Sequence, residues 1–511
     1  MTRIGILVCL LLAAQFHAQP TRAQPTRAQP AGGFDAQLAG NVYVAALSFM
    51  APRIVDPIPV SQLTQWGLRG ITAVDPRLTT ELNDSKLRLA IQGRTVMETP
   101  APKDELVANW VGAAITLTNA AASASPTIRQ AGTSGVIQAF FDELFNHLDP
   151  YSRYVPPLEA GEDREQRSGR AGIGISLARR GQAVVVSDVI RDSPAAAAGM
   201  RPGDTIVAID GTSIRGLDAN SVAALVAGPE DTAFTLRWRS REGKPYEVAF
   251  VRVLVPPETV FEQRLDDLLV VRIAGFNNTT DTHLAHTLQD GLAGARPPIG
   301  IVLDLRGNRG GLLRQAVTVA DTFLPEGLVA SAAGRAPEAN HIWNSTPGEL
   351  AEGLPVIVLV DGRTASAAEV LAAGLADRGR AVVVGSSTLG KGLVQTIAPL
   401  PDGGELFVTW SRLLAPRGWP IQGLGVMPQV CTSLDEAATR QQMAALAEGD
   451  QSMKAAIIAH RNARAPVPAS RIPAVRDACP AAEGRPGDLA VARTLIANPA
   501  AYAAALLPPM R

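Results

Sequence analysis

The chain has 511 residues, 46% of them hydrophobic, which is enough for roughly two to four domains with sizeable cores. The formal net charge of −1 gives no indication of a nucleic-acid partner or of binding to an anionic membrane surface. After the N-terminus, no apolar run has the length that a membrane span needs.

The N-terminus has the pattern of a secretory signal. Arg3 precedes an apolar stretch over residues 4–14, and small residues follow it. The pentad Gln-Pro-Thr-Arg-Ala then occurs twice over residues 19–28, which is typical of a flexible spacer. We therefore expect residues 1–30 to be a signal peptide and spacer, and the mature chain to reach the periplasm across the inner membrane.

Two cysteines, Cys431 and Cys479, remain once the signal is removed. Because export implies an oxidising compartment, we predict a disulfide between them that contributes about 3–4 kcal/mol to stability. The alternative is a pair of buried, reduced cysteines.

Residues 34–165 are expected to form a mainly helical N-terminal region. Apolar residues recur at three-and-four spacing over 61–72 and 136–148, which indicates two helices. Segments 97–104 and 119–134 are rich in Pro, Ala, Ser and Thr, so we expect loops there.

Each of these helices is followed by a similar phrase, at residues 74–77 and 148–151, which hints at a duplicated unit. Asp149-Pro150 in the second phrase is typical of a helix stop rather than of a functional site.

From residue 168 to about 255 the pattern changes to short strands and turns. The phrases that mark this stretch are Ser193-Pro194-Ala195, Ala198-Gly199-Met200, Pro202-Gly203-Asp204 and Ile209-Asp210-Gly211. Together they resemble a PDZ domain, which binds a C-terminal carboxylate on the N–H groups of a glycine loop and adds the peptide as a strand. This resemblance assigns the peptide-binding loop to Gly172, Ile173, Gly174 and Ile175. The alternative is a unit that only packs as scaffold.

Residues 257–430 alternate apolar strands with helices, which predicts an α/β domain. The expected strands are 268–273, 299–305, 354–360, 381–385 and 405–414, and the expected helices are 281–293, 312–323 and 366–376. The tail, residues 431–511, is Ala-rich and helical in pattern.

His283 and His286 have i, i+3 spacing on one predicted helix, which in principle suits a metal. No third ligand follows in a convincing pattern. We therefore expect a solvated helix face and no metal.

Ser366 falls at a strand-to-helix turn, where a hydroxyl lies near the unpaired N–H groups of a helix N-terminus. Lys391 follows the next apolar run and is framed by Gly390 and Gly392. Serine needs a base to become a good nucleophile, and a lysine can serve if burial lowers its pKa until it is neutral. We predict that Ser366 is the nucleophile and Lys391 the base.

Residues 308–311, Asn-Arg-Gly-Gly, form a glycine turn between a strand and a helix. Because glycines leave N–H groups unshielded, we predict that the N–H groups of Gly310 and Ala367 form an oxyanion hole. Residues 385–392 are a near miss for a phosphate-binding loop, since Gly392 stands where a Ser or Thr would hold magnesium. No nucleotide is therefore expected.

The order of these phrases resembles that of the C-terminal processing peptidases, also called tail-specific proteases. The matching segments lie at residues 148–154, the PDZ unit, 304–311, 364–369, 390–395 and 418–428. In this family a glutamine four residues past the lysine helps to orient it, which implies that role for Gln395. Arg309 stands where the family usually has a proline, and Gln429 where an aspartate is common.

The resemblance covers roughly residues 136–430, and residues 35–135 and the tail match the family poorly. Together with the helical patterns of those two regions, it predicts a multidomain α/β protein. Its parts are an N-terminal helical region (34–165), a β-rich PDZ domain (168–255), a mixed α/β core similar to ClpP and crotonase (257–430, with part of 136–165) and a helical C-terminal tail (431–511). The expected activity is that of an exported serine endopeptidase that needs no cofactor or metal. Its expected partners are protein substrates with apolar C-termini, an adaptor or activator protein and further copies of the chain. The alternative function is that of a catalytically silent PDZ scaffold of the envelope.

Overall fold

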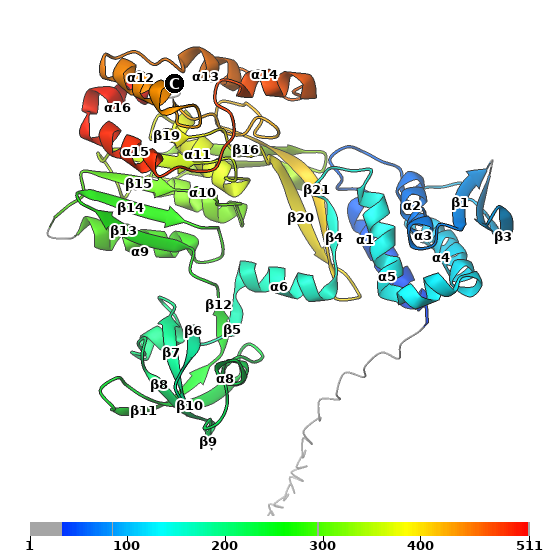
Figure 1. Cartoon of the computed structure of the whole chain (residues 1–511). Helices are drawn as coiled ribbons and strands as arrows, with labels where there is room; N and C mark the ends of the chain where they lie inside the picture. Colours follow the sequence, from blue (N-terminus) through cyan, green and yellow to red (C-terminus); the bar gives the residue numbers. More distant parts are fainter. Residues whose placement is uncertain (1–32, 84, 294–295, 509–511) are drawn as a thin grey trace, which may run out of the picture.

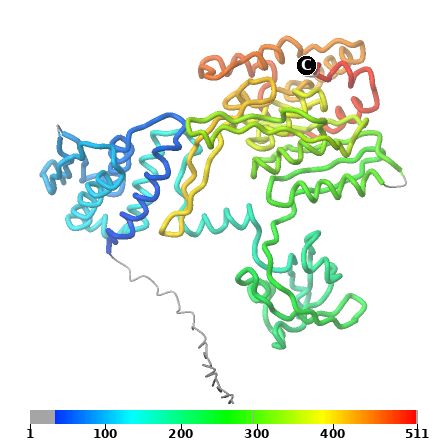
Figure 2. The backbone as a smooth tube through the Cα atoms, turned by 180° about the vertical axis from the view of Figure 1, so that it is seen from behind, coloured from blue at the N-terminus to red at the C-terminus, as the bar shows by residue number. Residues whose placement is uncertain are grey.

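A computed structural model describes residues 33–83, 85–293 and 296–508, so the predicted signal peptide and spacer at residues 1–30 lie outside the described residues. Figure 1 and Figure 2 show a large α/β core, an N-terminal helical region at one end of it, and a small β-rich unit to one side. Over these ranges, no helix combines the length and the apolar character that crossing a membrane requires.

The N-terminal region holds five helices packed around a shared apolar core. Their bounds are α1 (Ala36–Met50), α2 (Val60–Leu68), α3 (Gly70–Val74), α4 (Val107–Ala124) and α5 (Pro126–Phe145). A three-stranded antiparallel sheet is inserted between them, made of β1 (Leu78–Asn83), β2 (Lys86–Ile91) and β3 (Arg94–Pro100). The predicted mainly helical region therefore also contains a small sheet.

One predicted loop was wrong in part and the other in most of its length. Residues 97–100 belong to strand β3, whereas 101–104 are irregular as predicted, and residues 119–134 belong mostly to the end of α4 and the start of α5. Alanine, which was counted as part of a polar break, is the best helix former. Ser125 ends α4 and caps α5 by accepting the Ile128 N–H on its hydroxyl at 3.2 Å, and Pro126 occupies the first turn.

Residues 170–255 form the unit that was expected to be a PDZ domain. Its elements are β5 (Arg170–Gly172), β6 (Ile175–Arg180), β7 (Ala183–Val189), α7 (Pro194–Ala197), β8 (Thr205–Ile209), β9 (Thr212–Ser213), α8 (Ala219–Val226), β10 (Ala233–Arg239), β11 (Pro245–Val251) and β12 (Val253–Val255). The main sheet has the order β11-β10-β8-β7-β6 with β9 paired to β8, and it encloses a separate apolar core. Strands β5 and β12 pair with each other where the chain enters and leaves the unit.

The core is built on a six-stranded sheet in the order β13-β14-β15-β18-β19-β22. Its strands are β13 (Val260–Leu265), β14 (Leu268–Ile273), β15 (Gly300–Asp304), β18 (Val356–Val360), β19 (Val382–Gly385) and β22 (Val430–Cys431). All are parallel except the edge strand β13. The central strand β18 is a run of five buried aliphatic residues, as expected for a parallel strand covered on both faces.

Helices cover both faces of this sheet. On one face lie α9 (Thr280–Leu292), α10 (Leu313–Asp321) and α11 (Ala367–Asp377). The other face is covered by three helices of the C-terminal tail: α12 (Glu436–Ala447), α15 (Gly487–Ala497) and α16 (Pro499–Ala505). The tail also contains α13 (Lys454–Arg461) and α14 (Ile472–Arg476).

A second sheet links the core to the N-terminal region. It has the order β17-β16-β21-β20, with β4 paired to β21. Its strands are β16 (Gly327–Gly334), β17 (His341–Ser345), β20 (Leu393–Pro399), β21 (Glu405–Leu414) and β4 (Arg153–Val155). The β20–β21 hairpin extends toward the N-terminal helices in Figure 1, and its tip packs into their core. Helix α6 (Pro157–Ser168) then leads from β4 to the 170–255 unit.

The tail is attached to the core by a disulfide and by hydrogen bonds to the loops that follow β18 and β19. Cys431 and Cys479 form a disulfide, as predicted. The carbonyl of Ala482 accepts the Gly362 N–H at 2.7 Å and the Ser386 hydroxyl at 2.9 Å. The tail therefore braces the two loops whose residues carry the predicted chemistry.

Candidate active site

Ser366 lies between β18 and α11, immediately before the first helical residue, Ala367. Its backbone has φ 58°, a left-handed conformation that is rare for a side chain other than glycine. Such a conformation costs about 1–3 kcal/mol and persists only where the surroundings impose it. The strained turn therefore fixes where the serine side chain stands at the N-terminus of α11.

Lys391 lies in the loop between β19 and β20 and is half-buried. Burial lowers the pKa of its ammonium group, and the positive charge of Arg153 lowers it further. The negative charges of Glu369 and Asp149 act in the opposite direction, but the net direction is downward. A downward shift is the direction that favours a lysine as a general base.

Glu369 connects the loop that holds Ser366 to the loop that holds Lys391. No role was predicted for this residue from the sequence. Its carboxylate is fully buried and accepts the backbone N–H groups of Ser366 and Lys391 on one oxygen, at 2.7 and 2.8 Å. The other oxygen accepts the Gly390 N–H and the Thr388 hydroxyl. Burial raises the pKa of Glu369, and these hydrogen bonds oppose that shift.

Ser366 and Lys391 line one cleft of about 920 Å³. Apolar walls come from several elements: Phe276, Leu312, Leu313, Leu393, Ile397 and Phe407. Among the described residues, no hydrogen bond joins the Ser366 hydroxyl to the Lys391 ammonium group. The structure therefore brings the predicted nucleophile and base to the same cleft without a hydrogen bond between them.

Gly310 lies against Ser366, and in this conformation its N–H donates to the Asn308 side-chain oxygen at 2.8 Å. Its role as an oxyanion donor stays a prediction. Asn308 is fully buried, and its amide donates to the Ile273 carbonyl, so its orientation is fixed. Ala367, the other predicted donor, has no hydrogen-bond acceptor for its N–H in the described part of the chain.

Gln395 lines the same cleft, and within the described ranges no hydrogen bond joins its side chain to Lys391. Its amide nitrogen donates to the Leu393 carbonyl at 3.0 Å and to the Thr409 hydroxyl at 3.1 Å. The orienting role that the resemblance implied for Gln395 is therefore not seen in this arrangement. A bulge in β20 at this residue turns its side chain toward β21.

Helix α5 ends at Phe145, before Asp149, and the Asp149 side chain is part of a hydrogen-bond network. Its carboxylate accepts the N–H groups of Tyr151 and Ser152 and the hydroxyl groups of Ser152 and Thr409. Through Thr409 it is linked to Gln395. The close match of residues 148–154 to the family phrase was the available sequence signal for this role.

The predicted peptide-binding loop, Gly172, Ile173, Gly174 and Ile175, lines a groove of about 130 Å³. Apolar residues of helix α8, including Ala223 and Val226, form the opposite wall. Gly174 has φ 79°, and an added Cβ there would lie 2.3 Å from Ser193, so only glycine fits. The groove lies between a strand edge and a helix, which is where strand addition of a peptide takes place.

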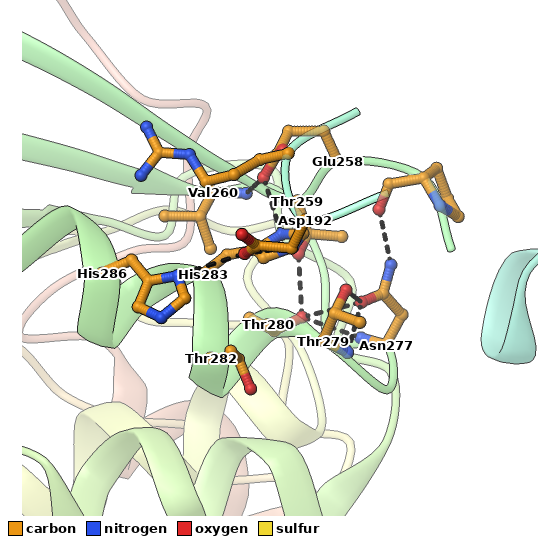
Figure 3. A network of polar contacts seen from close by, with 12 residues as sticks. Asp192, Glu258, Thr259, Val260, Asn277, Thr279, Thr280, Thr282, His283 and His286 are labelled. Atoms are coloured by element: carbon orange, nitrogen blue, oxygen red, sulfur yellow. Dashed lines mark hydrogen bonds and ion pairs between the residues drawn. The ribbon is translucent and has the colours of Figure 1, made fainter. Parts of the chain in front are cut away.

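His283 was predicted to lie on a solvated helix face, and that prediction was wrong. The side chain is only 4% exposed, and its Nδ1 lies 3.1 Å from a Glu258 oxygen. Figure 3 shows Asp192, from the 170–255 unit, between His283 and His286, at 3.9 Å and 3.1 Å respectively. No group of acidic, histidine or cysteine side chains within the described ranges has the geometry of a metal site.

Comparison with known proteins adds two domain assignments. Residues 267–432 match the model of peptidase family S41, and residues 185–240 match that of the PDZ domain.

Three curated proteins are similar to this chain over a little more than half of its length. A carboxy-terminal-processing protease of Bartonella bacilliformis is 35% identical over 301 residues, which cover 58% of this chain and 69% of that protein. A carboxy-terminal processing protease of Bacillus subtilis is 32% identical, covering 57% of this chain and 62% of its own length. A probable serine protease of Staphylococcus aureus is 35% identical, covering 57% and 59%.

Among solved structures, the photosystem II D1 C-terminal processing protease is 26% identical. That match covers 75% of this chain and 97% of the other, with a TM-score of 0.36.

Proposed function

Because the chain belongs to the carboxy-terminal-processing proteases of peptidase family S41, we propose that it is an exported endopeptidase that cleaves peptide bonds with Ser366 and Lys391. The observation that carries this proposal is the Glu369 carboxylate, which holds the backbone of both residues at one end of the cleft. The expected site of action is the periplasm.

In the proposed reaction, the Ser366 hydroxyl attacks the substrate carbonyl while neutral Lys391 takes its proton. Lys391 then gives that proton to the leaving amine, and water releases the acyl group from the serine. The Ala367 N–H, at the start of α11, stabilises the oxyanion. The turn at residues 308–311 supplies a second donor after the Gly310 N–H leaves the Asn308 side chain.

The PDZ domain would select substrates by their C-terminal tails. The groove beside residues 172–175 is apolar, which favours tails that end in apolar side chains. An adaptor or activator protein and self-association of the chain are further proposed partners.

The experiment is digestion of an unfolded reporter protein with an apolar C-terminal tail by residues 31–511. The same reporter with a C-terminal Asp-Asp is the matched substrate. We expect cleavage of the first to be at least tenfold faster, and we expect Ser366→Ala to abolish cleavage while leaving tail binding unchanged. Equal cleavage by wild type and Ser366→Ala would refute the assignment.

A second candidate function is a PDZ scaffold without catalysis. It is favoured by the missing contact between Ser366 and Lys391 and by the Gly310 N–H, which is bonded within its own turn. Hydrolysis that depends on Ser366 under any condition excludes it.

A further inference from the structure

The ammonium group of Lys391 rests against an aromatic ring. Its Nζ lies 4.9 Å from the centroid of the Tyr151 ring, which is within the range of a cation–π interaction. Within the described residues, Nζ forms no ion pair and no hydrogen bond to any side chain or carbonyl. The ring face is therefore the group that receives the ammonium in this conformation.

Tyr151 is held in place through its backbone. Its backbone N–H donates to the Asp149 carboxylate at 3.0 Å, and that carboxylate is anchored to β21 through the Thr409 hydroxyl at 2.7 Å. Strand β21 also pairs with β20, which begins at Leu393, two residues after Lys391. The segments that carry the ring and the lysine are therefore both attached to β21.

We propose that Tyr151 is a positioning residue that holds the protonated Lys391 on its ring face, away from Ser366, in the resting enzyme. An aromatic face attracts a cation and has no comparable attraction for a neutral amine. Lys391 must therefore lose its proton and leave the ring before it can accept the proton of Ser366. The proposal rests on the proposed function, in which Lys391 is the base.

The groups around Lys391 act on its charge in opposing directions. Burial and the positive charge of Arg153 disfavour the ammonium form, whereas the negative charges of Glu369 and Asp149 favour it. The Tyr151 ring also favours the ammonium form. Weakening the negative potential of the ring face should therefore lower the pKa of Lys391. The lysine should then lose its proton, and leave the ring, at a lower pH.

The test changes the ring's electronic character and leaves its shape almost unchanged. Position 151 is replaced by phenylalanine and then by phenylalanines with one, two, three and five ring fluorines, because fluorine withdraws charge from the ring face. The pKa of Lys391 is read from the ¹³Cε chemical shift of labelled lysine in the Ser366→Ala background, with Lys391→Arg to assign the signal. Activity against pH is measured in the same series with Ser366 intact.

We expect the pKa of Lys391 to fall stepwise with fluorination, by about half a unit to one and a half units in all. The rising limb of the activity profile should move to lower pH by a similar amount. The same series at Tyr154 is the matched control, because that ring stacks on Phe141 at 5.0 Å and its hydroxyl donates to Asp402. Substitution there should leave the pKa of Lys391 unchanged.

A Lys391 pKa that stays constant, or rises, along the position-151 series would overturn the proposal. If no Ser366-dependent hydrolysis is found, the proposed function fails, but the chemical-shift titration still decides whether the Tyr151 ring holds the ammonium. A constant pKa combined with normal hydrolysis rejects the role of Tyr151 and leaves the proposed function standing.

Discussion

Glu369 accepts the backbone N–H of Lys391 at 2.8 Å on the same oxygen that accepts the Ser366 N–H at 2.7 Å. Lys391 follows β19 and Ser366 follows β18, so one buried carboxylate ties together the loops at the ends of two neighbouring parallel strands. Ligands commonly bind at such strand ends in α/β sheets. The relative position of Ser366 and Lys391, the proposed nucleophile and base, therefore depends on a carboxylate that holds the backbones of both residues.

Glu369→Gln should damage both folding and hydrolysis. The glutamine amide has a single acceptor oxygen, so one pair of buried donors loses its partner, at about 1–3 kcal/mol per donor. We expect a loss of several kcal/mol in chemical denaturation and at least a hundredfold loss of hydrolysis. Glu352→Gln, at an exposed glutamate, is the control and should change neither. A folded Glu369→Gln variant with wild-type activity would show that this carboxylate does not align the dyad.

Gly310→Ala should abolish activity, whereas Gly307→Ala should be tolerated much better. An added Cβ at Gly310 would lie 2.9 Å from the Ser366 Cβ and from the Ala365 carbonyl oxygen. Gly307 has a similar backbone, with φ 73°, but open space around it. Both variants have the strain of a left-handed alanine, about 1 kcal/mol. The difference in activity between them therefore reports the clash of the added Cβ with Ser366.

The comparison is made by measuring kcat and unfolding free energy for both variants. Equal activities of Gly310→Ala and Gly307→Ala would mean that close packing of Gly310 against Ser366 is not required for catalysis.

Sequence patterns predicted the strand-to-helix turn at Ser366 and the glycine-framed lysine because both are local. The contacts that depend on tertiary packing were not predictable in the same way. The Gly310 N–H donates to Asn308, only two residues away, and nothing in the phrase Asn-Arg-Gly-Gly specifies which way that side chain turns. The ring of Tyr151 reaches Lys391 from 240 positions earlier in the chain, through a loop anchored by Asp149.

The small sheet of the N-terminal region was missed for a different reason. Strand β1 buries only Leu78 and leaves most of its remaining residues exposed, so the alternation of apolar and polar residues that marks a strand is weak. His283 was misjudged because its side chain is buried and lies next to Glu258 and, from a different domain, Asp192, which no helix periodicity reveals.

Removal of the disulfide should destabilise the tail more than the active site. The bond closes a loop with a sequence separation of 48, which predicts a loss of about 3–4 kcal/mol in Cys479→Ser. Denaturation of wild type with and without reductant provides the same comparison without a mutation. A stability change below about 1 kcal/mol would contradict a structural role for the bond.

Stability in acid should depend on His460. Burial first, and then the charge of Arg461, lowers the pKa of His460 to about 3. The unfolded chain therefore binds a proton at this histidine between about pH 6.5 and 3 that the folded chain does not. As the pH is lowered from about 6.5 to 3, the free energy of unfolding should decrease by about 1.4 kcal/mol per pH unit. Above about pH 6.5, His460 should have no effect on the pH dependence of stability.

His460→Gln retains a donor for the Gly425 carbonyl, which accepts from His460 Nε2 at 3.0 Å, and should flatten that decline. His341→Gln, at an exposed histidine, is the control. An unchanged pH dependence in His460→Gln would mean that other groups cause the acid lability.

The most direct test of the central claim is hydrolysis of an unfolded protein by residues 31–511, compared with Ser366→Ala and Lys391→Ala, from pH 6 to 10. We predict that both substitutions abolish cleavage. Wild-type activity should rise with pH to a midpoint below the ordinary lysine value of 10.5, because burial lowers the pKa of Lys391 and only its neutral form can act as base. Activity that survives in Lys391→Ala with the same pH profile would contradict the assignment of Lys391 as the base.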